Sequence, residues 1–238
     1  MAARKFLILL CSVFALINIS PQFPWNSAFA AEQKSIEPDL AKIGDSKVWK
    51  LVGLEATTAE KGGKRLANLK TLPDENGSTD HISMALLSGV EFNTGTIELD
   101  LRGRGDTLRC FLGVCFHVED EKTHEAVYFR PFNFKAKDDV ARSHGVQYIS
   151  LPDHTWERLR KEHEGVYENA VKPTPDPEGW FHAKIEVTEK KVRVWVDVAA
   201  EPTLTIDRLS KRQKGSIGLW TTVREGDFAN LKITPDTK

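Results

Sequence analysis

The stretch EAVYFRPFNF, residues 125–134, places an aromatic ring and a guanidinium group on the same side of an expected β-strand. Val127 and Phe129 alternate with Tyr128 and Arg130, so burial of the first pair turns the second pair to the other face. Aromatic rings can stack on the CH faces of sugars, and a guanidinium group donates paired hydrogen bonds to oxygen acceptors. This face is therefore a candidate site for a polar ligand with apolar patches, such as a sugar.

A preceding strand extends this face. Residues 108–118 alternate in the same way and are predicted to pair with the stretch as a hairpin, because that register aligns the apolar positions of both strands. The register sets Gly113 opposite Tyr128, which leaves open space beside the ring, and it sets Arg130 opposite Phe111. We expect a pocket floor made of a ring, a guanidinium group and a void.

Residues 96–102 are expected to join the same sheet through a turn at GRGD. This turn would place Glu98 and Asp100 on the candidate face, with Asp100 opposite Arg109. The expected apolar pairs are Leu101 with Leu108, Leu99 with Cys110, and Ile97 with Leu112. Glu98 and Asp100 are candidate catalytic carboxylates, and a plain cross-strand ion pair with Arg109 is the alternative role for Asp100.

A long insertion, residues 131–177, follows with almost no strand pattern. Long segments of this kind often form lids or binding loops. TWERLRKEHEG predicts one short helix, since Trp156, Leu159 and His163 share a face and Gly165 ends it. The candidate ligand-binding residues of the face and the insertion are Arg109, Phe111, Tyr128, Arg130, Asn133, His144, Gln147, Tyr148 and Trp156. Alternatively, the insertion covers the face and makes a second core, and both roles are compatible.

The N-terminus has the features of an export signal. Arg4 and Lys5 precede the apolar run FLILLCSVFALINI, and AFAAE supplies a small-residue cleavage pattern, so residues 1–30 are predicted to be a signal peptide. The run is shorter than the ~20 residues that span a bilayer, and we expect no stable membrane anchor after cleavage. Residues 31–45 are expected to form a flexible lead-in to one domain, residues 46–238, located in the periplasm or outside a bacterial cell.

The mature chain has 31 basic and 34 acidic residues, which argues against a nucleic-acid partner. It keeps two cysteines, Cys110 and Cys115. Five residues of extended strand span roughly 16 Å, whereas a disulfide needs Cα atoms within about 7 Å. Both are therefore predicted to remain thiols.

No metal site is expected from the sequence. Cys115, His117 and His124 fall close together in the predicted register, but a fourth zinc ligand at a fixed offset is missing. Calcium is possible, because the acids at 119–121, or Glu225 with Asp227, could supply oxygen ligands. No recognisable calcium loop accompanies them.

The remaining chain reads as short strands separated by Gly, Asn, Asp or charged turns, which predicts an all-β sandwich. The clearest further hairpin pairs Ile185 with Val194 and Val187 with Val192. Its other face sets charged side chains opposite each other and is expected to face solvent.

Several motifs resemble those of bacterial exported members of the concanavalin A-like lectin/glucanase superfamily. They are GTIELDLRGRG, FLGVCFHVEDEKTHEAVYFRPFNF, VQYI, TWERLR, GWFHAKIEV, VRVWVD and GSIGLWTTVREGDFANLKI, spread from about Trp49 to Ile233. The nearest likeness is to laminin-G-like jelly rolls and to the 3-keto-disaccharide hydrolase family. The resemblance implies a jelly roll of two antiparallel sheets whose concave face binds glycans or holds catalytic acids.

Retaining glucanases of this superfamily carry a Glu-x-Asp-x-x-Glu strand. Glu98 and Asp100 match its first two acids, but Gly103 stands at the third, so the general acid is missing. Three hypotheses follow. The first is an exported carbohydrate- or glycoconjugate-binding domain, the second a glycoside hydrolase or lyase acting on (3-keto) disaccharides with His144 as a candidate base, and the third an envelope protein-interaction module.

Overall fold

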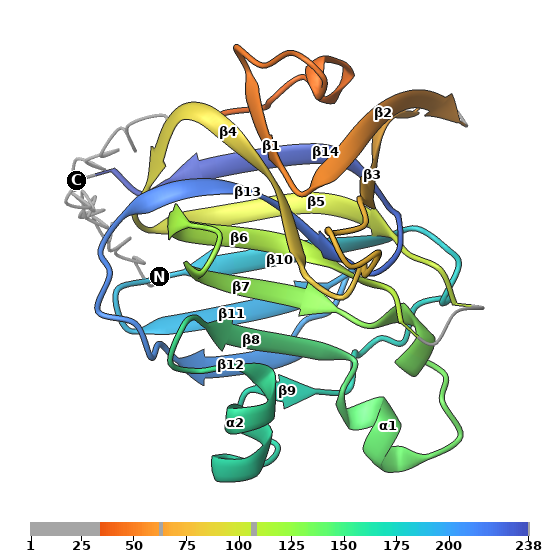
Figure 1. Cartoon of the computed structure of the whole chain (residues 1–238). Coiled ribbons are helices and arrows are strands. Elements are labelled where there is room, and N and C mark those ends of the chain that lie inside the picture. Colours follow the sequence, from red (N-terminus) through yellow and green to blue (C-terminus); the bar gives the residue numbers. More distant parts are fainter. Residues whose placement is uncertain (1–33, 62–63, 106–108, 238) are drawn as a thin grey trace, which may run out of the picture. The chain divides into compact units, whose positions relative to one another are not determined.

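The computed structural model describes residues 34–61, 64–105 and 109–237. Within them, two seven-stranded antiparallel sheets pack around an apolar core to which both contribute (Figure 1). The expected all-β sandwich is confirmed. The predicted signal peptide lies outside the described residues. Among the residues that are described, no helix is long and apolar enough to cross a membrane.

One sheet, called the front sheet, carries the candidate face. Its strands follow the order β1 (Trp49–Val52), β4 (Ile82–Phe92), β13 (Gly215–Thr222), β6 (Phe111–Asp120), β7 (Thr123–Phe129), β8 (Val146–Ser150) and β9 (Glu168–Asn169). The hairpin register predicted for β6 and β7 is confirmed, with Leu112 beside Phe129 and Gly113 beside Tyr128.

The other sheet, called the back sheet, packs its inner face against the front sheet. Its order is β12 (Leu204–Asp207), β11 (Lys191–Val196), β10 (Phe181–Val187), β5 (Gly95–Arg102), β14 (Gly226–Pro235), β3 (Lys64–Thr71) and β2 (Leu54–Lys61). The predicted pairs Ile185 with Val194 and Val187 with Val192 are confirmed. Across the sandwich, Phe129 of β7 meets Phe181 of β10 edge to face, with ring centroids 5.0 Å apart.

The predicted hairpin at GRGD is wrong. β5 pairs with β10 and β14 in the back sheet, whereas β6 belongs to the front sheet. The alternation in both strands is real, because Leu99 and Leu112 are fully buried in the same core. The same alternation is expected whether the two strands lie side by side in one sheet or oppose each other across a sandwich, so it does not distinguish the two arrangements. The expected pair Leu101 with Leu108 involves a residue outside the described ranges.

Residues 34–45 are held against the domain and do not form a loose lead-in. Ile36 forms an antiparallel bridge with Ile233, with N···O distances of 2.7 and 2.8 Å. The short 3-10 helix η1 (Leu40–Lys42) follows, and Leu40 and Ile43 are buried in the core.

The insertion contains more regular structure than its sequence suggested. It holds the 3-10 helix η2 (Pro131–Asn133), the helix α1 (Asp139–Ser143), strands β8 and β9, and the helix α2 (Trp156–Glu162). The helix expected in TWERLRKEHEG is confirmed as α2, which begins at the cap Thr155 and buries Leu159. The strand β8 was missed, although its sequence VQYIS is rich in strand-favouring residues and all of them are buried.

Candidate functional site

The outer face of the front sheet carries side chains in rows that cross the strands. In one row the registered neighbours are Met84, Trp220, Gly113, Tyr128, Gln147 and Glu168. Trp220 and Tyr128 flank Gly113, and their rings stack with centroids 4.6 Å apart and an interplanar angle of 20°. The space expected beside Tyr128 is therefore filled by the Trp220 ring.

Gly113 has a steric reason to be glycine. A Cβ atom there would lie 2.1 Å from the carbonyl oxygen of Val127 and 2.6 Å from the Cα of Tyr128, both in the neighbouring strand. Such distances are far inside van der Waals contact. The residue lets β6 and β7 approach closely beneath the stacked rings.

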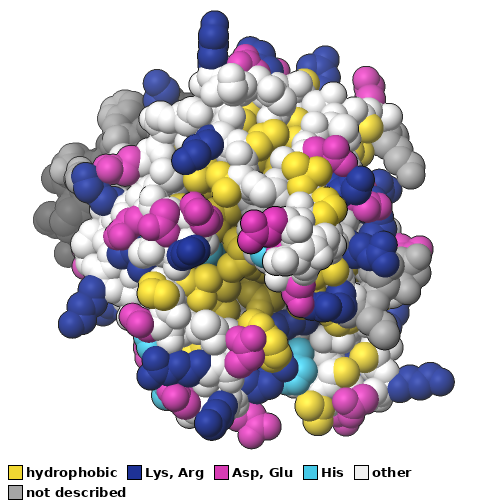
Figure 2. Space-filling view, in the orientation of Figure 1, with side chains coloured by type: hydrophobic (Ala, Val, Ile, Leu, Met, Phe, Trp, Pro, Cys, Tyr) yellow, Lys and Arg dark blue, Asp and Glu magenta, His cyan; other side chains and the backbone are white. Residues whose placement is uncertain are grey.

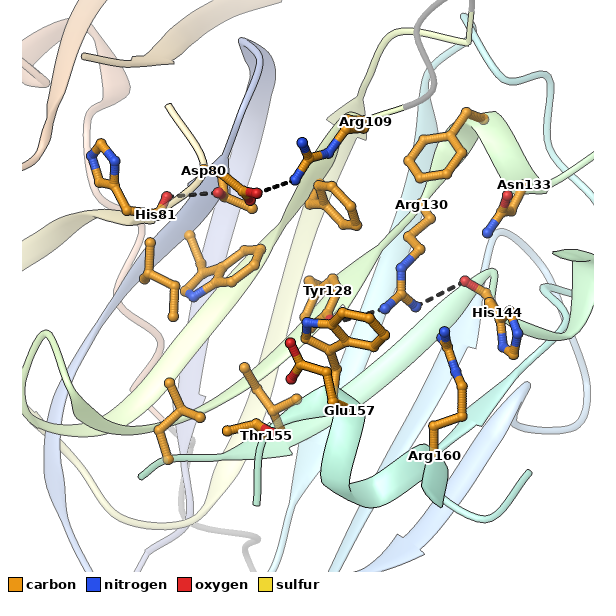
Figure 3. A pocket seen from close by; sticks show the side chains of 18 residues that line it. Asp80, His81, Arg109, Tyr128, Arg130, Asn133, His144, Thr155, Glu157 and Arg160 are labelled. Atoms are coloured by element: carbon orange, nitrogen blue, oxygen red, sulfur yellow. Dashed lines mark hydrogen bonds and ion pairs between the residues drawn. The ribbon is translucent and has the colours of Figure 1, made fainter. Parts of the chain in front are cut away.

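A pocket of about 680 Å³ opens on this face, bounded by α2 and the loops of the insertion. Its aromatic lining consists of Phe111, Tyr128, Phe132, Trp156 and Trp220, and its other apolar residues are Ile82, Ile149 and Leu151. Its polar lining consists of Asp80, His81, Arg109, Arg130, Asn133, His144, Thr155, Glu157, Arg160 and Thr222. Figure 2 shows an apolar hollow on this face with acidic and basic side chains around it, and Figure 3 shows the lining side chains.

Arg130 is a buried part of the pocket floor, with 5 % of its surface exposed. Its guanidinium group donates to the Tyr128 hydroxyl and to the His144 carbonyl at 3.0 Å each, and also to Gln147 Oε1. It also packs 5.5 Å from the Phe111 ring centroid. Burial lowers the pKa of Arg130 and raises the pKa of Tyr128 to about 12. The floor is thus both a second core and the base of a pocket.

Glu168 connects the pocket floor to the helix α2. Its carboxylate accepts two hydrogen bonds from Arg160 of α2, at 2.8 and 2.7 Å, and lies 2.9 Å from Nδ1 of His144 and 3.7 Å from Arg130. Because these contacts join α2, β9 and the segment after α1, the carboxylate fixes the wall of the pocket. Burial lowers the pKa of His144 despite this carboxylate, and the hydrogen bond to Glu168 raises the pKa of Arg160.

Two exposed groups stand at the rim. Arg109 and Asp80 form an ion pair, and both side chains are more than half exposed. On α2, the residue Trp156 is 41 % exposed, and its ring has the Arg160 guanidinium 4.9 Å from the centroid. An exposed aromatic ring beside polar groups is available to contact a ligand.

The structure brings most of the predicted site residues together. Seven line the pocket: Arg109, Phe111, Tyr128, Arg130, Asn133, His144 and Trp156. Gln147 is fully buried below them, where its Oε1 accepts from Tyr128 and Arg130. Whether these side chains contact a ligand stays a prediction.

The placement of Tyr148 on this face is wrong. Tyr148 is registered with Val127, so its side chain points between the sheets, where it is fully buried. Its hydroxyl donates to Glu125 at 2.5 Å, and Arg208 donates to the same carboxylate at 2.7 and 3.2 Å. Burial would raise the pKa of Glu125, but hydrogen bonds from His117 and Arg208 outweigh it and lower the pKa to about 2.

Glu98 and Asp100 do not belong to the pocket. They alternate with the core residues of β5, so they lie on the outer face of the back sheet. Asp100 is registered with His182 and not with Arg109, and its carboxylate lies 2.9 Å from His182 Nδ1 and accepts from Asn230 at 2.7 Å. The expected pairing of Asp100 with Arg109 is therefore wrong.

Two of the residues considered for metal binding, His117 and Asp227, are engaged elsewhere. His117 has a positive φ of 49° where the β6–β7 register shifts, which turns its ring inward to Glu125, 2.7 Å away. Asp227 accepts from Asn68 and pairs with Arg102. Within the part of the chain that the structure describes, no three His, Cys, Asp or Glu side chains cluster as metal ligands would.

Cys110 and Cys115 are free thiols, and both are buried. Their sulfur atoms lie 3.7 Å from the Glu225 carbonyl and 3.9 Å from the Leu219 carbonyl, respectively. Burial raises the pKa of both thiols, that of Cys110 to about 11. They serve as packing residues.

Further pocket residues, from distant strands, η2, β8 and α2 with its cap, were not predicted from the sequence. These are Asp80, His81, Ile82, Phe132, Ile149, Leu151, Thr155, Glu157, Arg160, Trp220 and Thr222. The alternation in GLWTT already put Trp220 and Thr222 on one face. Which face that was depended on the pairing of β13 with β6.

Comparison with known proteins identifies the fold. No family model matches the chain, and a search of curated proteins finds no match. Carbohydrate binding module CBM66 from Bacillus subtilis is similar in structure, with a TM-score of 0.52, 16 % identity and coverage of 79 % of this chain and 96 % of that one. A protein of unknown function with a galectin-like fold from the same organism gives a TM-score of 0.52 at 12 % identity, covering 83 % and 93 %.

The Ca²⁺-bound exoplasmic/lumenal domain of VIP36 gives a TM-score of 0.52 at 9 % identity, covering 87 % of this chain and 92 % of that one. Identities this low establish the fold and nothing finer. The two antiparallel sheets and these likenesses together show that the chain has a concanavalin A-like, galectin-like jelly-roll fold.

Proposed function

We propose that this chain binds a carbohydrate or glycoconjugate in the pocket on the outer face of the front sheet. The observation that carries the proposal is the composition of that pocket, in which aromatic rings and hydrogen-bonding side chains enclose about 680 Å³. A volume in the range of ~300–1,000 Å³ is typical of small-molecule sites. The similarity in fold to a carbohydrate binding module adds support.

The two kinds of side chain suit the two kinds of surface on a sugar. The exposed Trp156 ring offers a face for CH groups, and Asn133 and His144 offer groups that can exchange hydrogen bonds with hydroxyls. Because the floor residues Tyr128 and Arg130 are held by internal hydrogen bonds, the site needs little ordering on binding.

We also propose that binding takes place outside the cytoplasm. The support is the sequence of residues 1–30, which has the charged start, apolar run and small-residue cleavage pattern of a signal peptide. N-terminal sequencing of the protein from a bacterial periplasmic fraction should begin at Ala31.

A glycan array followed by calorimetric titration of the hits tests the binding proposal. Trp156→Ala should weaken binding roughly tenfold, because a lost aromatic contact is worth about 1.5 kcal/mol. Trp195→Ala is the matched control, since Trp195 lies on β11 of the back sheet beside Lys184. Absence of any glycan binding, or an equal loss in both variants, would contradict the proposal.

A second candidate function is cleavage of the bound glycoside, as the resemblance to the 3-keto-disaccharide hydrolase family implies. The observation in its favour is the distance of 2.9 Å between His144 Nδ1 and the buried Glu168 carboxylate, because a histidine oriented by a carboxylate is a common general base. Release of a monosaccharide from a 3-keto disaccharide, lost in His144→Gln and kept in His154→Gln, would support catalysis. Binding without product release would leave the first proposal in place alone.

A further inference from the structure

The pocket has a polar part built from four elements. Figure 3 shows Arg130, Asn133, His144 and Arg160 gathered on one side, away from His81. They come from the residue after β7, from η2, from the cap of α1 and from α2. Polar groups from four separate elements therefore converge at one side of the cavity.

The two arginines of this polar part are already paired. Arg160 donates two hydrogen bonds to Glu168, and Arg130 donates to Tyr128, Gln147 and the His144 carbonyl. The carboxylate of Glu168 offsets part of their positive charge. Besides Nη1 of Arg160, the groups of this part that remain for a ligand are the Asn133 amide and Nε2 of His144, because Nδ1 of His144 lies 2.9 Å from Glu168. An amide and an imidazole suit neutral hydroxyls better than a carboxylate or a phosphate.

The rest of the pocket has a mixed lining. Its apolar members include Ile82 of β4, Trp220 of β13, Ile149 of β8 and Leu151 just beyond β8, and its polar members are Asp80, His81, Arg109, Thr155, Glu157 and Thr222. Sugar hydroxyls placed against Ile149 and Leu151 would lose hydrogen bonds to water that these aliphatic side chains cannot replace, which is unfavourable. An apolar group would instead gain by leaving water.

This inference rests on the proposed function. We infer that the ligand is a glycoside in which a neutral sugar carries an apolar aglycone. The sugar lies against Asn133 and His144, and the aryl or alkyl group lies against Trp220, Ile149 and Leu151. The cavity of about 680 Å³ has room for both parts together.

Calorimetric titration with matched glycosides tests the inference. The probes are the methyl and 4-nitrophenyl glycosides of glucose, galactose, mannose, xylose and N-acetylglucosamine, each with either anomeric configuration. For the sugars that bind, the 4-nitrophenyl glycoside should bind at least tenfold more tightly than the methyl glycoside. Leu151→Asn should lower this aryl-to-methyl affinity ratio at least threefold, whereas Asn133→Ala should weaken both probes by the same factor.

The control variant is Leu72→Asn, because Leu72 is exposed and lies outside the pocket lining, so it should keep the wild-type ratio. Equal affinities for methyl and 4-nitrophenyl glycosides, or a ratio unchanged by Leu151→Asn, would overturn the inference while sugar binding itself stands. Failure of every glycoside and of the glycan array would overturn the proposed function as well.

Discussion

Trp220 and Tyr128 stack at a centroid distance of 4.6 Å although their strands, β13 and β7, are separated by β6. The residue between them in the row is Gly113, which has no side chain to hold the rings apart. This pair forms the aromatic floor of the pocket. The pocket therefore depends on a glycine in a strand that itself contributes Phe111 to the lining.

Replacing this glycine should damage the fold. Gly113→Ala places a methyl group 2.1 Å from the Val127 carbonyl oxygen, so β6 and β7 must separate and the domain should lose about 2 kcal/mol or more of unfolding free energy. Urea denaturation gives this value. Gly44→Ala, where nothing lies within 4 Å, should stay within ~0.5 kcal/mol of wild type. Equal midpoints for Gly113→Ala and wild type would mean that the strands are not this close.

Arg130 should contribute to stability as well as to the site. Because Arg130→Ala removes the guanidinium group that donates to Gln147 Oε1, the Tyr128 hydroxyl and the His144 carbonyl in a buried floor, we expect a loss of about 2–3 kcal/mol, typical of lost buried hydrogen bonds from a charged group. The rim variant Arg109→Ala should cost at most ~1 kcal/mol, since its ion pair with Asp80 is exposed. Chemical denaturation of both variants makes the comparison. A small loss for Arg130→Ala would show that the guanidinium group is not integrated in the floor.

His124 should make the stability depend on pH. Burial, followed by the charge of Arg212, lowers its pKa from the ordinary 6.5 to about 4. The unfolded chain binds this proton first as the pH falls, so the stability contributed by the neutral ring is complete above pH 6.5 and is lost towards pH 4. The loss over this window is about 3 kcal/mol.

Urea titrations of wild type and His124→Gln at pH 7.5, 5.5 and 4.5 measure this contribution. As the pH falls, the unfolding free energy of the wild type should decrease more than that of His124→Gln. A difference that stays constant across the three pH values would show that the ring is not buried as described.

The sequence was sufficient to predict which side chains of a strand share a face, but not which strands distant in sequence pair with each other. The alternation around Leu112 and Phe129 defined the β6–β7 register, because a slip by one residue would have exposed every apolar side chain. In VQYIS the apolar residues occur at both parities, so nothing in the stretch decided that Gln147 faces the pocket and Tyr148 the core. Trp220 reaches Tyr128 only because β13 pairs with β6, a strand more than 90 residues earlier in the chain. No local sequence pattern encodes this pairing.

The bulge at His117 is a similar case. Period-two alternation placed this residue on the outer face, but a backbone φ of 49° and the register shift after Phe116 turn it into the core. A non-glycine residue with positive φ is uncommon, and local sequence gives little sign of it. The buried contact of His117 with Glu125 became visible only in three dimensions.

The central claim is that a sugar occupies the pocket between Trp156 and the floor beneath it. The indole N–H signals of the tryptophans, followed by two-dimensional NMR during titration with a glycan that binds, test it most directly. The account predicts that the signals of Trp156 and Trp220 shift, while those of Trp195 on the back sheet and Trp49 in the core stay in place. Shifts at Trp195 with none at Trp156 would contradict it.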